Sequence, residues 1–483
     1  AYIALEDDGD CRAASVAIAG PVRNGSGTLT NLDWTIDEAT LARATKAEFV
    51  AVLNDLEAQG HALGRLAAEN LREVVPGPAP REVINTPVPN GTAENQDDAP
   101  ETVEVTTVEA LRSAVLAARP GQVIALRPGL YEITGPALEI TTPGRAERRI
   151  TLRGSPAGAT RLELSSGEGF RVGAPYWTFE NLMIDGTCPA DSRCEHAFHV
   201  VGNGSAVVIR NNRITNFNAA VKVNGEDGRF PDDGLIEGNL FYNDRIRQTG
   251  RPVATLDIVA VNGWHVRGNM IADFAKAGGD RVSYGAFFKG GGSDNVFEQN
   301  VVRCEWRHSG ATRVGFSFGG GSSSPDACRD GACAFEHSNG IARNNVILNC
   351  PNDVGIYLNS SAGTLIYNNA VIGTRGIDVR FPGSTAEIFN NVIDGRILAR
   401  DGGSYTAETN LVSLAKALLL AKISRSVYSD PAAGDLRLIA PERIRGLGRP
   451  VAAPGLDVCG RPYGTGNPDI GPIQYAAGAP CAP

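Results

Sequence analysis

The chain has 483 residues, of which 42% are hydrophobic and 20% are charged. This composition supplies enough apolar side chains for a folded core, and it excludes the disordered, collagen-like and coiled-coil classes of protein. The 45 basic and 54 acidic residues give a net charge of −9, with no block of Lys or Arg and no run of 18 apolar residues. We therefore expect neither a nucleic-acid partner held through its phosphates nor a membrane span.

The first part of the chain, residues 1–75, is predicted to form a small appendage. Over residues 36–75 the apolar residues recur at helical spacing, Ala, Leu and Glu are frequent, and strand formers are sparse. This pattern predicts one or two amphipathic helices. Residues 76–101 contain six Pro and few aliphatic residues, which is the composition of a linker.

A repeat occupies the remainder, residues 102–483. Each repeat contains an Asn followed by two or three apolar or small residues, and the spacing is 19–31 residues with one step of 45. Short strands repeated at this interval predict a right-handed parallel β-helix. Asn suits its turns because it tolerates a left-handed backbone and its amide can bond to the next coil. The repeated residues are Asn181, Asn212, Asn239, Asn269, Asn300, Asn345, Asn369, Asn391 and Asn410.

Two segments of this domain differ from the repeat. Residues 107–133 join an amphipathic helix to a Pro-Gly turn and a Val-Ile-Ala-Leu strand, so this helix is predicted to cap the open end of the stack. The step of 45 residues contains an insertion at 319–338. Because insertions on one side of a solenoid usually build its binding face, we expect ligand binding near this insertion.

The nine Cys residues indicate disulfides rather than a metal site, because zinc-ligand spacing is absent. Disulfides place the protein in an oxidising compartment, secreted or periplasmic. The start at Ala1, without a Met or a signal peptide, is expected of a mature exported protein. Cys11 is left without a partner. The predicted pairs are Cys188 with Cys194, Cys328 with Cys333, Cys304 with Cys350, and Cys459 with Cys481.

The opening at 107–133 and the ending DLRL…DVCGRP…DIGPIQY at 435–475 resemble those of secreted, pectate-lyase-like β-helix proteins that degrade polysaccharides. With the Asn repeat, the resemblance covers roughly residues 102–476. It implies the fold. That superfamily includes lyases, hydrolases, esterases, epimerases and adhesins, so the function depends on the site.

The sharpest candidate site surrounds Lys289, which ends a predicted strand and precedes three Gly residues that leave space above it. Aligning the coils on their Gly positions places Lys289 in one column with Gly319, Asn359 and Arg380. Such a column on the face formed by residues 285–380 can bind an extended acidic polysaccharide. The predicted substrate-binding residues are Arg303, Trp306, His337, Asp353, Asn359 and Arg380.

The segment from Lys289 to Asn295-Val296 resembles polysaccharide lyase family 6, the chondroitinase B and alginate lyase group. That group pairs a Lys base on one coil with an Arg acid on the next, near a calcium site. The resemblance implies β-elimination on a uronic acid with Lys289 as the base. The family's Arg has no counterpart at 315–320. The predicted acid or carboxylate neutraliser is therefore Arg307 or Arg313, His308 is a further catalytic candidate, and the implied Ca²⁺ ligands are Asp294, Glu298 and Glu305.

Two other classes of function stay open. A glycoside hydrolase needs two carboxylates, and a C5-epimerase on the same fold can use Asp or His. A non-catalytic carbohydrate-binding, adhesin or surface assembly protein would use the β-helix as a scaffold and the N-terminal helices for contacts, including oligomerisation. The side chains considered for the enzymatic alternatives are Asp232, Asp233, Asp257, Asp353, Asp378, His308 and His337.

Overall fold

The structure is a computed structural model with two compact units, Ala1–Asn95 and Gln96–Pro483. In the second unit it describes residues 101–155, 159–413, 422–452, 454–463 and 466–476. In the first unit it describes the backbone of five strands. The remaining residues, with Cys11, Cys481 and most of the predicted linker among them, lie outside the described residues.

The N-terminal unit contains strands where helices were predicted. Strand β1 (Ala13–Ile18) pairs in parallel with β5 (Phe49–Asn54). Strands β2 (Val22–Arg23), β3 (Ser26–Thr28) and β4 (Thr35–Asp37) form an antiparallel sheet. The prediction of helices over 36–75 is therefore wrong at β4 and β5. The run Phe-Val-Ala-Val-Leu at 49–53 is rich in residues that favour strands, and its pairing with β1 outweighs the helical spacing around it.

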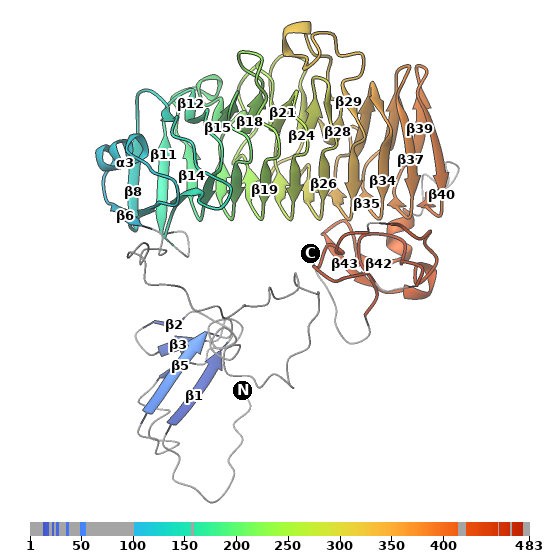
Figure 1. The fold of residues 1–483 in the computed structure, drawn as a ribbon. Helices are drawn as coiled ribbons and strands as arrows, with labels where there is room; N and C mark the ends of the chain where they lie inside the picture. Colours follow the sequence, from blue (N-terminus) through green and yellow to red (C-terminus); the bar gives the residue numbers. More distant parts are fainter. Residues whose placement is uncertain are drawn as a thin grey trace, which may run out of the picture. The chain divides into compact units, whose positions relative to one another are not determined.

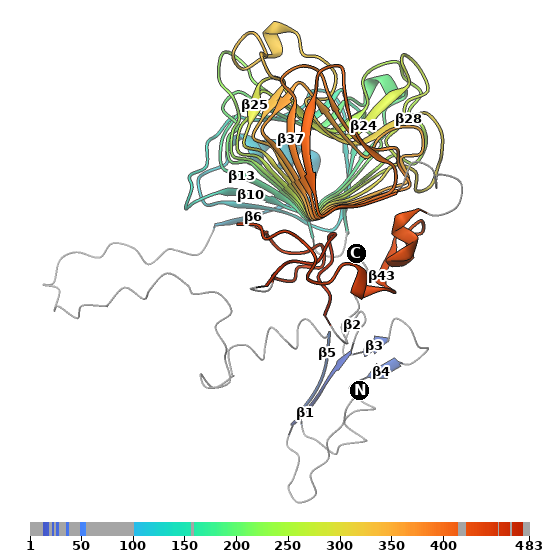
Figure 2. The ribbon, with the colours of Figure 1, turned by 90° about the vertical axis from the view of Figure 1, so that its right-hand side faces the viewer.

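The second unit is the predicted right-handed parallel β-helix. The chain passes repeatedly through a ten-stranded, a twelve-stranded and an eleven-stranded sheet, and every neighbouring pair within these sheets is parallel (Figures 1 and 2). Crossovers between parallel strands of one sheet are right-handed as a rule, because a right-twisted strand favours that hand. The ten-stranded sheet contains β9 (Leu138–Ile140), β12 (Glu168–Val172), β15 (His196–Val201), β18 (Ala219–Asn224), β21 (Ala254–Val259), β24 (Val282–Lys289), β28 (Thr312–Phe318), β32 (Ile356–Asn359), β36 (Gly376–Arg380) and β39 (Arg396–Arg400).

The other two sheets have shorter strands. The twelve-stranded sheet contains β6 (Thr102–Val105), β7 (Val123–Leu126), β10 (Ile150–Arg153), β13 (Trp177–Glu180), β16 (Val208–Arg210), β19 (Leu235–Glu237), β22 (His265–Arg267), β26 (Val296–Glu298), β30 (Ile341–Arg343), β34 (Thr364–Tyr367), β37 (Thr385–Phe389) and β40 (Ser404–Glu408). The eleven-stranded sheet contains β8 (Gly129–Ile133), β11 (Thr160–Leu164), β14 (Met183–Gly186), β17 (Arg213–Thr215), β20 (Leu240–Tyr242), β23 (Met270–Ala272), β27 (Val301–Arg303), β31 (Val346–Leu348), β35 (Ala370–Ile372), β38 (Val392–Ile393) and β41 (Leu411–Val412). A small sheet of β25 (Gly292–Ser293), β29 (His337–Ser338) and β33 (Ser361–Ala362) lies at the turn before the twelve-stranded sheet.

The core consists of inward side chains that stack from coil to coil. Phe170 and Phe198 stand in register in the ten-stranded sheet, and their rings stack with centroids 4.9 Å apart. Phe179 of the twelve-stranded sheet packs against Phe198 at 5.0 Å. The alternation of strand side chains sends the residues between these positions outward, where they are free to contact a ligand.

The predicted Asn ladder runs between the twelve- and eleven-stranded sheets and is confirmed. From Asn212 to Asn410, the backbone N–H and Nδ2 of each ladder Asn donate to Oδ1 of the next at 2.9–3.2 Å. The left-handed residue is the one before the ladder position, for example Asn211. Asn181 occupies that earlier position, so in its coil the N–H of Leu182 bonds to Asn212.

Both ends of the stack have additional structure. The predicted cap is the helix α3 (Val108–Leu116), which buries Leu111 and Val115. Thr107 caps its N-terminus, because the Thr107 hydroxyl accepts a hydrogen bond from the Ala110 N–H. The C-terminal segment contains an antiparallel pair of β42 (Tyr428–Asp430) and β43 (Asp435–Leu438). Short 3₁₀ turns lie at Asp191–Arg193, Pro325–Ala327, Ile423–Ser426 and Pro441–Arg443. Within the described ranges, no helix is long and apolar enough to cross a membrane.

Three predicted disulfides are confirmed, namely Cys188–Cys194, Cys304–Cys350 and Cys328–Cys333. Cys459 is also disulfide-bonded. Its predicted partner lies outside the described residues. The bond between Cys304 and Cys350 joins two coils that are next to one another, because β27 pairs with β31.

Candidate functional site

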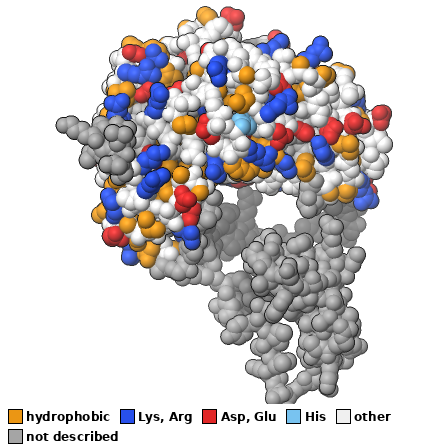
Figure 3. Space-filling model, turned by 180° about the vertical axis from the view of Figure 1, so that it is seen from behind, with side chains coloured by type: hydrophobic (Ala, Val, Ile, Leu, Met, Phe, Trp, Pro, Cys, Tyr) orange, Lys and Arg blue, Asp and Glu red, His pale blue; other side chains and the backbone are white. Residues whose placement is uncertain are grey.

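The outer face of the ten-stranded sheet carries a column of charged side chains. Arg171, His199, Lys222 and Asp257 occupy the same position on four consecutive strands. Neighbouring strands lie about 4.8 Å apart, so one sugar ring can reach side chains from two or three of them. Figure 2 places β24 and β28 of this sheet on the right, and Figure 3 turns that side toward the viewer, with acidic and basic side chains intermingled across it.

The local sequence explains why these four residues point outward. Each is a single charged or polar residue between two apolar ones, as in Phe-Arg-Val at 170–172, Phe-His-Val at 198–200 and Val-Lys-Val at 221–223. The flanking side chains are buried, so the middle one must face away from the core. This triplet was the signal in the sequence that could have revealed the column, and the prediction centred on Lys289 missed it.

His199 and Arg171 are held by acceptor groups from several coils. His199 Nδ1 lies 2.8 Å from Glu168 Oε1, and Nε2 lies 2.7 Å from Asn224 Oδ1. Arg171 forms ion pairs with Glu226 and, at 3.8 Å, with Glu168, and its Nη1 lies 3.5 Å from His199 Nδ1. These contacts fix both side chains at the sheet surface, where Arg171 keeps part of its surface exposed.

Lys222 and Asp257 form an ion pair of 2.9 Å. The second carboxylate oxygen of Asp257, Oδ1, is buried and has no hydrogen-bond partner among the described residues. His196 lies beside this pair, and burial, followed by the neighbouring His199, lowers the pKa of His196 to about 4. A His that is neutral at physiological pH, His196, therefore lies next to the paired Lys222.

The same column becomes buried and mainly aromatic in the next three coils. Phe287, Ser317 and Tyr357 succeed Asp257 on β24, β28 and β32. Phe287 packs edge-on against Tyr284, which is partly exposed, with ring centroids 5.4 Å apart. The three column residues themselves are buried, although they are on the outer face. This part of the face is covered by its own side chains.

Lys289 lies two residues after Phe287, and the predicted column is confirmed. Lys289 pairs with Val259, Gly319 directly follows the Phe288–Phe318 pair, and Asn359 pairs with Arg380. The Lys289 ammonium lies 5.0 Å from the centre of the Phe287 ring, and within the part of the chain that the structure describes it makes no ion pair. Asn359 is buried, whereas Arg380 is bonded to Asp401 at 2.5 Å.

The predicted partners of Lys289 lie at the opposite end of the strands. Arg313 pairs with Ser283, six residues before Lys289, which corresponds to about 20 Å along the strand. Arg313 is buried, and its Nη2 contacts His308 at 3.1 Å. Arg307 bonds to Asp244 at 2.9 Å. The prediction that Lys289 forms an acid–base pair with Arg307, His308 or Arg313 is therefore wrong. Alignment of the repeats identifies the residues of a column, but it does not show which loop lies at which end of a strand.

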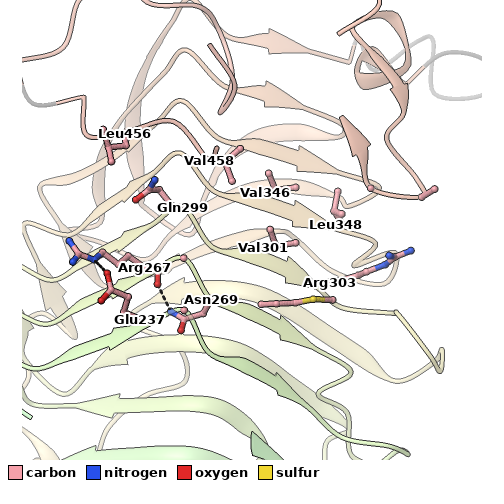
Figure 4. A pocket seen from close by; sticks show the side chains of 15 residues that line it. Glu237, Arg267, Asn269, Gln299, Val301, Arg303, Val346, Leu348, Leu456 and Val458 are labelled. Atoms are coloured by element: carbon pink, nitrogen blue, oxygen red, sulfur yellow. Dashed lines mark hydrogen bonds and ion pairs between the residues drawn. The ribbon is translucent and has the colours of Figure 1, made fainter. Parts of the chain in front are cut away.

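Several predicted substrate contacts also lie elsewhere. Arg303 belongs to the eleven-stranded sheet and lines a pocket of about 620 Å³ between this sheet and the C-terminal segment (Figure 4). His337 is fully buried, its ring stacks on Phe318 at 4.4 Å, and burial lowers its pKa to about 3. The prediction that these two residues contact substrate with Lys289 is wrong. Trp306, 37% exposed, lies beside Arg307 at 4.7 Å.

The carboxylates considered for hydrolysis do not form a pair. Asp378 is bonded to Arg400 at 2.8 Å, and Asp353 caps the neighbouring backbone N–H of Val354 before β32 begins. Asp232 is bonded by both Nη atoms of Arg329, from the insertion at 319–338, at 2.7 and 2.8 Å. Each of these three carboxylates already accepts hydrogen bonds from the protein itself.

The three predicted Ca²⁺ ligands do not converge. Glu298 is bonded to Arg343 at 2.6 Å, Asp294 accepts from Ser293 and Asn339, and Glu305 accepts from the Gly310 N–H in another loop. Among the described residues, the one group with metal-ligand proximity is Cys328, Asp330 and Cys333, whose two sulfurs are joined in a disulfide. These residues do not fit a calcium ion.

Comparison with known proteins finds a likeness in the N-terminal segment. The model of the glucokinase family matches residues 2–92. Glucokinase from Caulobacter sp. (strain K31) is 41% identical over 63 residues, which are 13% of this chain and 19% of that protein. Glucokinase from Rhizobium johnstonii is 38% identical over 73 residues, 15% of this chain and 21% of that protein. The chain thus spans about a fifth of the length of these relatives.

The β-helix is similar to several solved structures. Pectate lyase Pel9A has a TM-score of 0.48 and 14% identity, covering 75% of this chain and 90% of that one. An alginate lyase from Paenibacillus sp. str. FPU-7 has a TM-score of 0.39 and 16% identity, covering 65% and 99%. A PL6 family polysaccharide lyase from Pseudopedobacter saltans has a TM-score of 0.32 and 12% identity, covering 73% and 97%. The fold assignment depends on the sheet topology described above.

Proposed function

We propose that this protein is a polysaccharide-active enzyme that cleaves an acidic, uronate-containing polysaccharide by β-elimination, at the column of Arg171, His199 and Lys222. The observation that carries the proposal is the register that places these three side chains on consecutive strands of one outer face, where each is partly exposed. They supply the two kinds of group that the reaction needs, a base and cations for the uronate carboxylate.

The reaction divides among the three residues. Lys222, charged in its ion pair with Asp257, must first release a proton to the solvent. Its neutral amine then takes the C5 proton of the uronate, the released electron pair forms the C4–C5 double bond, and the C4–O bond breaks. Arg171 pairs with the uronate carboxylate while negative charge develops on it. We assign the proton for the leaving oxygen to His199, whose Nε2 must exchange its contact with Asn224 Oδ1 for that oxygen. The ammonium formed on Lys222 is then held by Asp257, 2.9 Å away.

The disulfides support a secreted or periplasmic location, because such bonds persist in oxidising compartments. Calcium binding stays a prediction, because the three predicted ligands do not converge. The activity screen below is therefore run both with Ca²⁺ and with the chelator EDTA. Phosphoryl transfer is not part of the proposal, because the N-terminal segment matches only about a fifth of a glucokinase.

The test is a screen for unsaturated uronate product, by ultraviolet absorbance, on pectate, alginate and chondroitin with Ca²⁺ or EDTA. We expect Lys222→Met to lower kcat/KM by roughly 10² to 10⁴-fold. Lys289→Met is the matched control on the same sheet, and we expect it to stay within about tenfold of the wild type, because a cation–π contact contributes little to chemistry.

Two results would overturn the proposal in different ways. Loss of activity in Lys289→Met but not in Lys222→Met would move the base to Lys289. Absence of unsaturated product on every polymer would reject β-elimination, and a reducing-end assay on the same polymers would then decide whether the protein is a hydrolase.

A further inference from the structure

A second cavity opens directly beside the proposed reaction column. It has a volume of about 530 Å³ and lies at the carboxyl ends of β9, β12 and β15. Its lining includes Tyr176, Asn203, Arg229 and Phe230. Gly173, also in the lining, is two residues after Arg171, which corresponds to about 6.6 Å along an extended chain. This separation is of the order of one sugar residue.

One segment of chain contributes to both the reaction column and the cavity. The segment 224–230 supplies Asn224 and Glu226, which hold His199 and Arg171. A few residues later it supplies Arg229 and Phe230 to the cavity. The backbone groups of Glu226 and Arg229 bond to one another at 2.9 and 3.0 Å, so the two parts are mechanically connected.

Tyr176 occupies a backbone position that tyrosine ordinarily avoids. It has φ +60° at the turn before the twelve-stranded sheet, where every coil from β13 to β34 has a left-handed residue. The equivalent residues in the other coils are Ala206, Asp233, Gly263, Asp294, Asn339 and Gly363. Gly, Asn and Asp tolerate this conformation, whereas a bulky residue is strained in it. The large ring at this position lines the cavity, which indicates that the ring is used there.

The cavity combines groups that recognise an acidic sugar. Tyr176 and Phe230 provide aromatic rings, on which the apolar face of a sugar can pack. Phe230 is held in place by Arg329, whose guanidinium lies 4.6 Å from the ring centre and is itself bonded to Asp232. Arg229 is exposed, and within the described ranges its guanidinium makes no ion pair. It is therefore available to a carboxylate.

We infer that this cavity is a subsite for the uronate residue next to the one that is cleaved, with Tyr176 as its stacking platform and Arg229 as its carboxylate ligand. The inference rests on the proposed function for the identity of the sugar. It implies that the polysaccharide extends from the reaction column across the turn before the twelve-stranded sheet, so part of its path runs along the strands rather than across them.

The test measures binding and stability together, using the full chain with Lys222→Met to prevent cleavage. The probes are oligogalacturonates and oligoalginates from dimer to hexamer, titrated calorimetrically. Tyr176→Asn removes the ring and installs the residue type found at Asn339. Arg229→Gln removes the charge. Ala206→Asn is the control, because it installs the same residue at the equivalent left-handed turn one coil away, at a position that does not line the cavity.

We expect Tyr176→Asn to keep or raise the melting temperature and to weaken binding of the longer oligomers about tenfold, which corresponds to the loss of one stacking contact. We expect Arg229→Gln to weaken them by a similar factor and Ala206→Asn to leave affinity unchanged. If Tyr176 had only a structural role, its replacement would weaken binding only by lowering the melting temperature as well. Unchanged affinity in both Tyr176→Asn and Arg229→Gln would overturn the inference.

The outcome separates this inference from the proposed function. If the wild type cleaves nothing but binding depends on Tyr176, the subsite is supported and the lyase is rejected. Cleavage by the wild type, with affinities that do not depend on Tyr176 or Arg229, supports the lyase and overturns the subsite. Failure of the wild type to bind or cleave any of these sugars overturns both.

Discussion

The ten-stranded sheet has two halves with opposite outer surfaces. From β12 to β21 its outward column is charged, with Arg171, His199 and Lys222, whereas from β24 to β32 the same column holds Phe287, Ser317 and Tyr357, which are buried. The backbone of the two halves is the same. The difference shows that a solenoid can carry charged side chains on one set of coils and buried side chains on the next by exchanging a single residue per coil.

The sharpest test of this comparison is one substitution in each half, with both the free energy of unfolding and the activity measured for each variant. We expect Phe287→Ala to lower the free energy of unfolding by about 4 kcal/mol, because it removes a buried ring that contacts Tyr284. Arg171→Gln should lower it by less than about 1 kcal/mol, since the ion pairs of Arg171 are partly exposed, while sharply reducing activity. Denaturant unfolding and product formation check both. Equal stability losses would erase the distinction.

The two halves also differ in the disulfides beside them. Cys304–Cys350, which closes 46 residues in the apolar half, should contribute about 4 kcal/mol, and Cys188–Cys194, which closes 6 residues in the charged half, about 2 kcal/mol. Paired Cys→Ser variants measured by denaturant unfolding check this order. The reverse order would mean that the loop at 188–194 is more important to the fold than its length indicates.

One His beside each half has a pKa lowered by burial. The pKa of the partly buried His196 of β15 falls to about 4, and that of the fully buried His337 of β29 falls to about 3. In the unfolded chain both rings bind a proton below about pH 6.5, but in the folded chain they stay neutral until the lower values. The free energy of unfolding is therefore highest above pH 6.5 and falls as the pH decreases, by about 3 kcal/mol for His196 by pH 4.

Replacement of either His by Leu should flatten this pH dependence by about 1.4 kcal/mol per pH unit between pH 6 and pH 4.5. Unfolding curves at several pH values, compared with the wild type, measure the slope. A slope that His196→Leu leaves unchanged would show that this ring is protonated in the folded protein.

The smallest effect is expected at the far end of the sheet. Arg380→Gln removes an ion pair with Asp401 that is substantially exposed, and we expect a change below about 0.5 kcal/mol in the free energy of unfolding. Its effect on cleavage should be equally small if the reaction occurs at the charged half. A large loss of activity would instead extend the binding surface to β36.

The features that repeat in the sequence were predictable, and those that depend on strand direction and loop paths were not. The Asn ladder, the column of Lys289 and Arg380, and the pairing of Cys304 with Cys350 all follow from aligning equivalent coil positions. Arg313 was proposed as a partner of Lys289 because the segment 315–320 contains no Arg, but Arg313 pairs with Ser283 on the parallel strand β24, which places it at the opposite end from Lys289.

The charged column was missed for a different reason. Arg171, His199 and Lys222 belong to three separate coils and have no motif in common beyond their apolar neighbours, so only a search for repeated apolar–charged–apolar triplets would have grouped them. The strand at Phe49–Asn54 was missed because helical periodicity around it was given more weight than its own Val and Phe content.

The Asn ladder has a consequence for how this molecule can change over evolutionary time. Each rung, such as Asn345 between Asn300 and Asn369, accepts from the coil before it and donates to the coil after it. All rungs are chemically interchangeable. Duplication or deletion of one complete coil therefore leaves the hydrogen bonds of every remaining rung intact. The length of the outer face of the ten-stranded sheet can grow or shrink by whole coils, while the charged column is inherited unchanged.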